Sequence, residues 1–246
     1  MQVRDRKDGE KVLVLGHRGS LNREVENTIS SFKRAIDEGA DGIELDVHLS
    51  IDGELIVIHD PTTKRVFGPD RRISEMTVKE IKEISHQIPT LEEVFSTMGN
   101  IYYDIEIKSE YSVDKELIRT LTKCLNKHPE LQDKIIVSSF HPLAMRAFRK
   151  LNGNKYPLGA IYEGPETTLP VFLQKGQGRF IFHADYLKPK WDIATREKHS
   201  KMKYPIVPWG VDTKDRLRKM LEIKAPIVIT NEPELIVKAL QEEGLH

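Results

Sequence analysis

The strongest constraint on this chain is a regular alternation of short apolar runs with longer amphipathic segments. Nine runs have the length and composition of β-strands, and they lie at residues 12–15, 43–47, 55–58, 101–107, 135–139, 158–161, 180–184, 206–209 and 227–230. With one exception, helical patterns separate them, which favours parallel strands joined by crossover helices. The sequence therefore predicts an α/β fold built on a parallel sheet.

One pair of runs departs from this rule, because only a tight turn separates them. The dipeptide Asp52-Gly53 suits a hairpin turn between the runs at 43–47 and 55–58. A turn this short can join only antiparallel strands. The second run therefore returns along the first, and it brings His59 back with it.

Removal of the hairpin strand leaves eight strands, each followed by a helix, in a chain of 246 residues. Eight strand–helix units in this length are the signature of a (β/α)8 TIM-type barrel. We expect residues 1–246 to form a single barrel domain, with a small cap inserted at approximately 48–76, between the second barrel strand and its helix. Two helices are expected nearby, one capped by Thr77 and one beginning at a Thr90–Glu93 capping box.

Polar residues gather where the predicted barrel strands end. Active sites of this fold lie at the C-terminal ends of the strands, so these residues are the candidates for chemistry. They are His17, Arg18, Glu44, Asp46, Glu106, Lys108, Ser139, His141, Trp209 and Asn231. For each of them a plainer interpretation exists, namely a solvated turn or a half-exposed strand.

Composition narrows the class of protein. The 38 basic and 38 acidic residues balance, which gives no reason to expect nucleic acid as a partner. The single cysteine, Cys124, can form no internal disulfide, and we assign it to helix packing. His128 is interpreted as a surface or structural residue. The charged N-terminus and the lack of a long apolar run predict a cytoplasmic protein without stable membrane insertion. The sequence specifies no oligomeric state.

Three carboxylates on neighbouring predicted strands suggest a cation site. Glu44 and Asp46 share one face of their strand, and Glu106 has the same position on the next barrel strand. Buried acids are costly unless they are paired, and carboxylate oxygens are the ligands that hard divalent ions prefer. The expected metal is therefore Mg²⁺ or Ca²⁺ rather than zinc.

Positive and titratable groups complete the candidate site. Arg18 and Lys108 beside a cation suggest an anionic substrate, and phosphate suits the guanidinium fork. Either residue could instead serve only as an ion-pair partner of a metal ligand. His17 and His59 can share acid and base roles near neutral pH. Together these groups predict metal-assisted cleavage of a phosphodiester.

Several segments carry a family resemblance, and they occur in the family's order over nearly the whole chain. They are HRG at 17–19, ENT at 26–28, IELDVHLSIDGELIVIHD at 43–60, IPTLEEVF at 88–95, DIEIK at 104–108, SSF at 138–140 and PWGVD at 208–212. In these segments the chain resembles the glycerophosphodiester phosphodiesterases. No single segment is decisive, but the ordered set is highly specific.

The resemblance implies a barrel with an inserted cap and a metal bound by Glu44, Asp46 and Glu106. It also implies that His17 and His59 act as general base and general acid, in an order that the sequence leaves open. Phosphate contacts would come from Arg18 and Lys108, and Trp209 could be a wall of the substrate site or a packing residue.

The reaction that the resemblance implies converts a glycerophosphodiester, such as glycerophosphocholine or glycerophosphoethanolamine, into glycerol 3-phosphate and an alcohol. We hypothesise that a neighbouring hydroxyl of the substrate attacks first and gives a cyclic phosphate. The alternatives are a phosphodiesterase of the phospholipase C or D type that acts on intact lipids, and a non-catalytic protein that binds a phosphodiester.

The chain departs from the family pattern at two places. The family's late strand usually ends in a Trp-Thr-Val-Asn type of run, whereas this chain has Trp209-Gly210-Val211-Asp212. The final strand usually ends in Thr-Asp, and here it ends in Thr230-Asn231. Neither change touches the proposed metal ligands or histidines, but both put the glycerol or alcohol preference in doubt.

Overall fold

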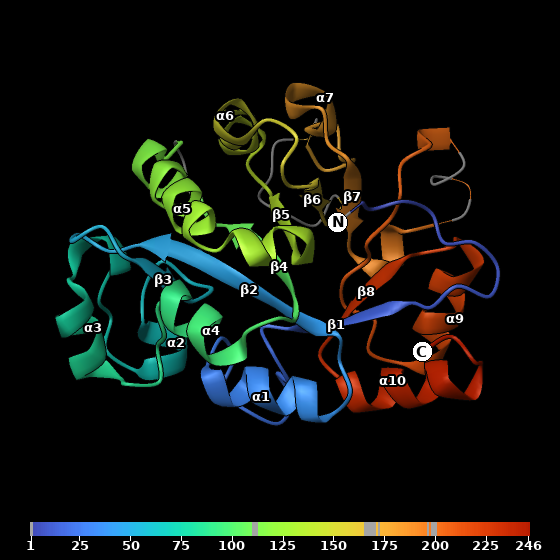
Figure 1. Ribbon diagram of the computed structural model, residues 1–246, viewed down its shortest axis with the longest axis horizontal. Helices are drawn as coiled ribbons and strands as arrows, with labels where there is room; N and C mark the ends of the chain where they lie inside the picture. The colour runs from blue at the N-terminus through green and yellow to red at the C-terminus, as the bar shows by residue number, and fades with distance from the viewer. Residues whose placement is uncertain (1, 110–112, 165–170, 172, 196, 198–200) are drawn as a thin grey trace.

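The computed structural model describes residues 2–109, 113–164, 171, 173–195, 197 and 201–246 (Figure 1). Within them an eight-stranded sheet runs in the order β7-β6-β5-β4-β2-β1-β8, with β3 paired to β2. The strands are β1 Leu13–His17, β2 Gly42–Leu49, β3 Leu55–Val57, β4 Tyr102–Ile107, β5 Ile135–Ser139, β6 Leu158–Tyr162, β7 Tyr186–Pro189 and β8 Ile227–Thr230. All neighbours are parallel except β2 and β3, so the predicted antiparallel hairpin is confirmed.

The sheet curls into a barrel, and a short extended segment links its two edge strands. Residues 206–209 form parallel bridges, with Ile206 opposite Leu187 of β7 and Trp209 opposite Ile229 of β8. The backbone N–H of Val207 donates to the carbonyl of Leu187 at 2.8 Å. The segment thus takes the place of the remaining barrel strand as single bridges rather than a continuous ladder. The α/β barrel class predicted from the sequence is confirmed.

One predicted strand is wrong. Residues 180–184 lie mostly in the short helix α7, Arg179–Phe182, and the strand follows it as Tyr186–Pro189. A short apolar run fits either structure, because too few residues are present to establish a period. The true strand contains Lys188, which is buried and made the segment look polar in the sequence. Two of the helical patterns that separate the predicted strands, at 169–175 and 193–202, lie partly outside the described residues.

Helices cover the outside of the barrel (Figure 1). The longer ones are α1 Ile29–Asp37, α4 Leu91–Met98, α5 Lys115–Lys127, α6 Pro142–Asn152, α9 Lys214–Glu222 and α10 Pro233–Glu242, and 3₁₀ turns lie at Pro129–Lys134 and Trp191–Ile193. The predicted capping box at Thr90 and Glu93 is present at the start of α4. Buried apolar side chains of these helices pack against the outward faces of the strands in the main hydrophobic core.

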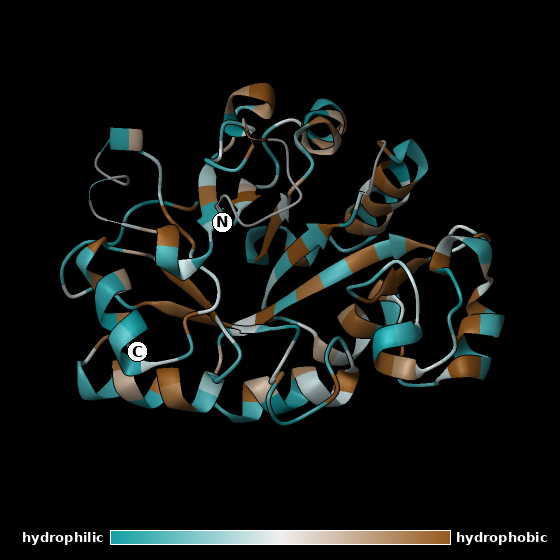
Figure 2. Ribbon diagram, turned by 180° about the vertical axis from the view of Figure 1, so that it is seen from behind, coloured by the Kyte–Doolittle hydropathy of each residue, from teal (hydrophilic) through white to brown (hydrophobic). Residues whose placement is uncertain are grey.

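Side chains of alternate strand residues fill the barrel interior. A buried apolar cluster, at the end of the barrel opposite the C-terminal strand ends, includes Leu15, Ile136, Tyr186 and Ile229. A side chain at Gly159 would begin 2.3 Å from the ring of Tyr186, so this glycine makes room for the ring. Towards the C-terminal ends of the strands the interior becomes polar. Figure 2 shows the alternation of apolar and polar residues along β2 as bands of brown and teal.

The segment between β2 and α4 forms a small insertion with its own apolar cluster. It comprises β3, α2 Lys64–Phe67, a 3₁₀ turn at Ile73–Glu75, and α3 Val78–Ile84, which begins at a capping box on Thr77 as predicted. The cluster consists of Ile56, Ile58, Ile73, Met76, Ile81 and Ile88. In Figure 1, α2 and α3 gather at one end of the molecule, beyond the tip of β2. The helix α3 thus packs within the insertion, and α4 is the helix that joins the main core.

Candidate active site

A cavity of about 440 Å³ opens at the C-terminal ends of the strands. Most of the residues proposed from the sequence line it together. The lining residues are His17, Arg18, Glu44, His59, Glu106, Lys108, Phe140, Ile161, Glu163, Lys188 and Trp209. Four candidates do not line it, and they are Asp46, Ser139, His141 and Asn231. Of these, Asp46 lies beside the lining residues, with Oδ1 2.9 Å from the Lys108 ammonium.

The turn after β1 presents His17 and Arg18 to the cavity. Arg18 and Gly19 both have positive φ angles, of 53° and 94°, so the chain reverses directly after the strand. A side chain at Gly19 would collide with Ser31 of α1, and only glycine allows this close packing. The backbone N–H of Arg18 then donates to Glu44 Oε2 at 3.2 Å. The turn is therefore fixed to both the helix and the carboxylate cluster.

The three proposed metal ligands converge as predicted from their strands. Glu44 and Asp46 are two residues apart on β2 and so point into the barrel together, and Glu106 of β4 lies directly opposite Asp46 in the parallel register. All three residues are buried, and one carboxylate oxygen of each lies within 4.8 Å of the others. Asn27 holds Asp46 in place, because its amide donates to Asp46 Oδ2 at 2.8 Å.

This donor set fits a divalent cation such as Mg²⁺ or Ca²⁺. Oxygens that share one Ca²⁺ at about 2.4 Å can be at most about 4.8 Å apart, which the cluster satisfies. Carboxylates this close repel one another unless positive charge lies between or beside them. The three acids can therefore bind a divalent metal.

Three buried or half-buried cations surround the acids. Arg18 Nε lies 3.4 Å from Asp46 Oδ2, and its Nη1 donates to Glu26. The Lys108 ammonium contacts both Asp46 and Glu106. Arg18 and Lys108 are thus ion-pair partners of the acids, as the alternative interpretation of the sequence allowed, and they also line the cavity.

The third cation, Lys188 of β7, was missed by the sequence analysis. Its ammonium lies 3.2 Å from Glu44 Oε1 and 2.9 Å from Asp104 Oδ2, and it donates to Ser138 Oγ. Burial alone would lower the pKa of Lys188, but the charges of Asp104 and Glu44 outweigh it and the pKa is raised. Its partners come from strands far away in the chain, so no local pattern signals the residue.

The acids respond to this charged environment in opposite directions. Burial opposes ionisation of Glu44 and Asp46, yet the positive charges of Lys188 and Lys108 outweigh it and lower the pKa of each carboxyl. Burial raises the pKa of Asp104 to about 6, and the charge of Glu44 adds to this, although Lys188 acts against it. Glu44 and Asp46 therefore remain ionised and able to bind a cation.

A chain of hydrogen bonds determines the tautomer of His17. The Asn231 amide donates to Asp212 Oδ2 at 3.1 Å, and because a carboxylate only accepts, Asn231 Oδ1 must face His17. Asn231 Oδ1 lies 2.7 Å from His17 Nδ1, which therefore carries the proton. The expectation that the change at Asn231 leaves the proposed histidines untouched is therefore wrong. His17 Nε2 is 3.9 Å from Glu44, too far for a hydrogen bond. Burial, more than any other influence, lowers the pKa of His17. The ring thus presents a basic nitrogen to the cavity.

His59 is held differently, by the insertion. Its Nδ1 lies 2.6 Å from Asp60 Oδ1, and its side chain is 31% exposed. Arg65 binds Asp60 and also forms two hydrogen bonds of 2.7 Å with Glu26, which in turn binds Arg18. This ionic ladder, Asp60–Arg65–Glu26–Arg18, connects the insertion to the first turn of the barrel.

The wall of the cavity includes Trp209, whose ring lies 6.3 Å from that of His17. Phe140, Ile161 and Glu163 also line it, and the sequence analysis proposed none of these three. Burial raises the pKa of Glu163, with Lys190 the strongest opposing charge. By contrast, His141 caps the helix α6, because its ring accepts from the backbone N–H of Ala144.

Comparison with known proteins identifies the family. The sequence pattern of the glycerophosphoryl diester phosphodiesterase family matches residues 17–235. The chain belongs to this family. It is 31% identical, over 95% of its own length and the full length of the relative, to a glycerophosphodiester phosphodiesterase of Caldanaerobacter subterraneus subsp. tengcongensis.

Solved structures of glycerophosphodiester phosphodiesterases share the fold. The enzyme from Thermotoga maritima has a TM-score of 0.74 and 30% identity, covering 92% of this chain and 97% of that one. An Oleispira antarctica phosphodiesterase, solved with its product sn-glycerol-3-phosphate, has a TM-score of 0.80 at 22% identity, covering 94% and 97%. The chain is thus an enzyme of the glycerophosphodiester phosphodiesterase type.

Among the described residues, no helix has the length and apolar character needed to cross a membrane.

Proposed function

We propose that the enzyme carries out a metal-dependent hydrolysis of small glycerophosphodiesters, such as glycerophosphocholine and glycerophosphoethanolamine, to glycerol 3-phosphate and an alcohol. The observation that carries this proposal is the convergence of two histidines, three cations and a carboxylate cluster on one cavity. The product bound to the Oleispira antarctica phosphodiesterase supports glycerol 3-phosphate as the product here.

The metal would be held by Glu44, Asp46 and Glu106. When bound, Mg²⁺ or Ca²⁺ supplies a Lewis acid that neutralises negative charge developing on the phosphoryl oxygens. Arg18 and Lys108 offer further donors to the same oxygens, and a guanidinium beside an ammonium suits a phosphodiester anion. Trp209 would form an apolar wall against the glycerol or alcohol carbons.

His17 would act as the general base. Its protonated Nδ1 is bound to Asn231, so Nε2 has a free lone pair on the cavity side. We propose that Nε2 removes the proton from the attacking hydroxyl, which forms a bond to phosphorus. If that hydroxyl belongs to the glycerol of the substrate, the first product is a cyclic phosphate, and water opens the ring in a second step.

His59 would act as the general acid. Asp60 fixes its tautomer and can stabilise the imidazolium form, as a carboxylate does behind a catalytic histidine. As the bond from phosphorus to the leaving alcohol breaks, the alcohol oxygen takes the proton from His59. In ring opening the roles reverse, and the histidine that lost its proton accepts one from water.

A cationic head group would suit the cavity wall. Glu163 lines the same cavity as Phe140 and Trp209, and aromatic faces together with an acid attract ammonium groups. We expect choline and ethanolamine diesters to be preferred over glycerol diesters of the same size. Glu163→Gln should remove this preference, measured as the ratio of kcat/KM values, and should leave kcat on the glycerol diester within about twofold.

Product analysis on a panel of glycerophosphodiesters tests the proposed function. We expect glycerol 3-phosphate from wild type with Mg²⁺ or Ca²⁺, none with EDTA, and only a trace with His17→Ala. Full activity in EDTA would overturn the metal dependence, and full activity of His17→Ala would overturn the base assignment. Release of head groups from intact lipid vesicles would favour the phospholipase alternative, and tight binding without turnover would favour a sensor.

A cyclic phosphate would distinguish the two routes of attack. Phosphorus NMR during a single turnover should reveal it if the substrate's hydroxyl attacks first. Oxygen from labelled water entering in a single step, without a cyclic species, would instead establish direct attack by water. The cytoplasmic location and the single-domain assignment of residues 1–246 with a cap at 48–76 stay predictions.

A further inference from the structure

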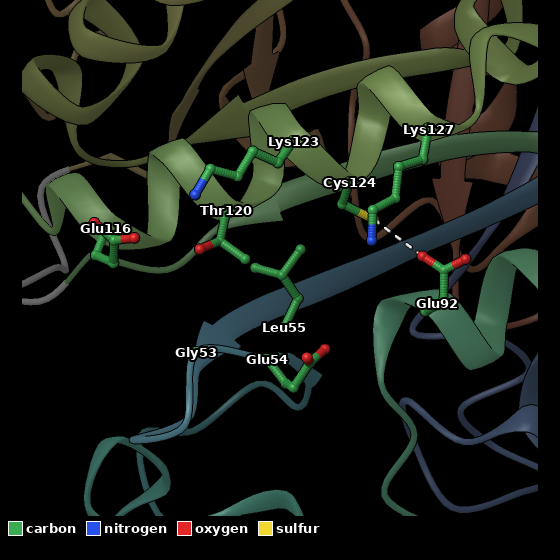
Figure 3. Close-up of a pocket in the computed structure, with 9 residues that line it drawn as sticks. All are labelled: Gly53, Glu54, Leu55, Glu92, Glu116, Thr120, Lys123, Cys124 and Lys127. Atoms are coloured by element: carbon green, nitrogen blue, oxygen red, sulfur yellow. Dashed lines mark hydrogen bonds between the residues drawn. The ribbon is translucent and has the colours of Figure 1, made fainter.

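A second pocket, of about 290 Å³, lies away from the catalytic cavity, between α5, α4 and the hairpin that leads into β3 (Figure 3). In Figure 3 the side chains of α5 face Glu54 and Leu55 on the hairpin and Glu92 on α4. The lining residues are Gly53, Glu54, Leu55, Glu92, Glu116, Thr120, Lys123, Cys124 and Lys127. It contains the only cysteine of the chain.

Three side chains with different ligand atoms meet at one end of this pocket. Cys124 lies in the last turn of α5, and His128 is the capping residue directly after this helix. Glu92, in the first turn of α4, faces them. Its Oε2 lies 3.8 Å from Cys124 Sγ, and its Oε1 lies 2.8 Å from His128 Nε2.

We propose that Glu92, Cys124 and His128 form a second metal site, for a zinc-like divalent cation. One ligand atom from each lies within 4.8 Å of the others. Sulfur, imidazole nitrogen and carboxylate oxygen are the three donors that Zn²⁺ takes, at about 2.0–2.3 Å, so tetrahedral ligand atoms are about 3.3–3.8 Å apart. The Cys124–Glu92 distance already lies in that range. The adjoining pocket leaves room for water as a fourth ligand.

The surroundings favour this arrangement in two ways. His128 Nδ1 lies 3.3 Å from Glu130 Oε1, so a carboxylate can orient the ring with Nε2 towards the metal, as is common behind metal-binding histidines. The carboxylates Glu54, Glu92 and Glu116 line the pocket against the ammonium groups of Lys123 and Lys127, so the pocket has a net negative charge.

This site differs in chemistry from the catalytic carboxylate cluster. Glu44, Asp46 and Glu106 offer only oxygen, which suits hard ions, whereas the thiol selects softer ones. Burial raises the pKa of Cys124 to about 12, so the thiol is protonated at neutral pH. Binding must therefore release the thiol proton to solvent as the metal–sulfur bond forms, and His128 must be neutral.

Titration with Cd²⁺ tests the proposal directly, because a thiolate bound to Cd²⁺ gives an ultraviolet charge-transfer band. Cys124 is the only thiol, so the catalytic site cannot contribute to this band. We expect the band to saturate at one Cd²⁺ per thiol, with release of the thiol proton as the metal–sulfur bond forms. Zn²⁺ should displace Cd²⁺ and abolish the band.

Variants distinguish a metal site with three protein ligands from metal binding by the Cys124 thiol alone. Cys124→Ser should abolish the band, and His128→Gln and Glu92→Gln, which keep the thiol, should raise the Kd at least about tenfold. Glu116→Gln is the matched control, because Glu116 lines the same pocket outside the trio, and its affinity should equal that of wild type. Thermal unfolding without metal checks that each variant is folded.

Two results would overturn the proposal. One is the absence of a band in folded wild type at a large excess of Cd²⁺. The other is an unchanged Kd in both His128→Gln and Glu92→Gln, which would reduce the site to a thiol alone. Because a bound ion would link α4 to α5, Zn²⁺ should also raise the Tm of wild type more than that of Cys124→Ser.

Discussion

His17 and His59 reach the same cavity from regions of opposite construction. His17 ends a barrel strand, is largely buried, and is held by the neutral amide of Asn231. His59 lies on the insertion, is about one-third exposed, and is held by the carboxylate of Asp60. This difference is the basis of the proposed roles, with His17 as base and His59 as acid, because the neutral amide leaves His17 Nε2 as an acceptor and the Asp60 carboxylate accepts from His59 Nδ1.

The largest effect is expected when each imidazole ring is removed in turn. His17→Ala and His59→Ala should each lower kcat about 10²–10⁴-fold on glycerophosphocholine. A glycerol phosphodiester with p-nitrophenol as leaving group needs little protonation, so it should restore much of the activity of His59→Ala and none of that of His17→Ala. Restoration of both variants, or of His17→Ala alone, would break the assignment of base and acid.

A smaller effect is expected from exchanging the group behind His17. In Asn231→Asp the new carboxylate would stabilise the imidazolium form and raise the pKa of His17. Because the base must be neutral, the acidic limb of the kcat/KM profile should move to higher pH, with about a tenfold loss near pH 6. An unchanged limb would mean that another group titrates there. Leu143→Ala, on the exposed surface of α6, serves as a control.

The smallest effect is expected behind His59. Asp60→Asn keeps a hydrogen-bond acceptor but removes the charge that supports the imidazolium form. We expect kcat to fall about tenfold at most, since the ring remains. The activated p-nitrophenyl substrate should hide the change. A loss as large as that of His59→Ala would indicate that Asp60 contributes more than charge.

The site residues that could be predicted from the sequence are those whose positions follow from local patterns. His17, Glu44, Asp46 and Glu106 follow regular strands, so their alternation was enough to predict that they share a barrel mouth. His59 was found because Asp52-Gly53 specifies a hairpin, a signal as local as the strand period. The barrel class followed from the repeated strand–helix units.

The parts that were missed depend on distant contacts. Lys188 is buried only because Glu44 and Asp104 neutralise it, and these partners lie on other strands. The run at 180–184 was too short to distinguish helix from strand. Residues 206–209 were predicted as a strand, but the sequence did not show that they would pair only through single bridges to Leu187 and Ile229. Asn231 was noted near a strand end, but its orientation follows from Asp212, which only the folded chain brings close.

The ionic ladder of Asp60, Arg65, Glu26 and Arg18 has a consequence for protein engineering. Because Arg65 hydrogen-bonds both Asp60 of the insertion and Glu26 of the barrel, the insertion is tied to the barrel through Glu26. A chimera that grafts residues 50–88 onto a related barrel would carry His59 and Asp60 but leave Glu26 behind. Introducing a glutamate at the position of Glu26 in the host barrel should be the smallest further change that keeps His59 correctly placed relative to the turn after the host's first strand.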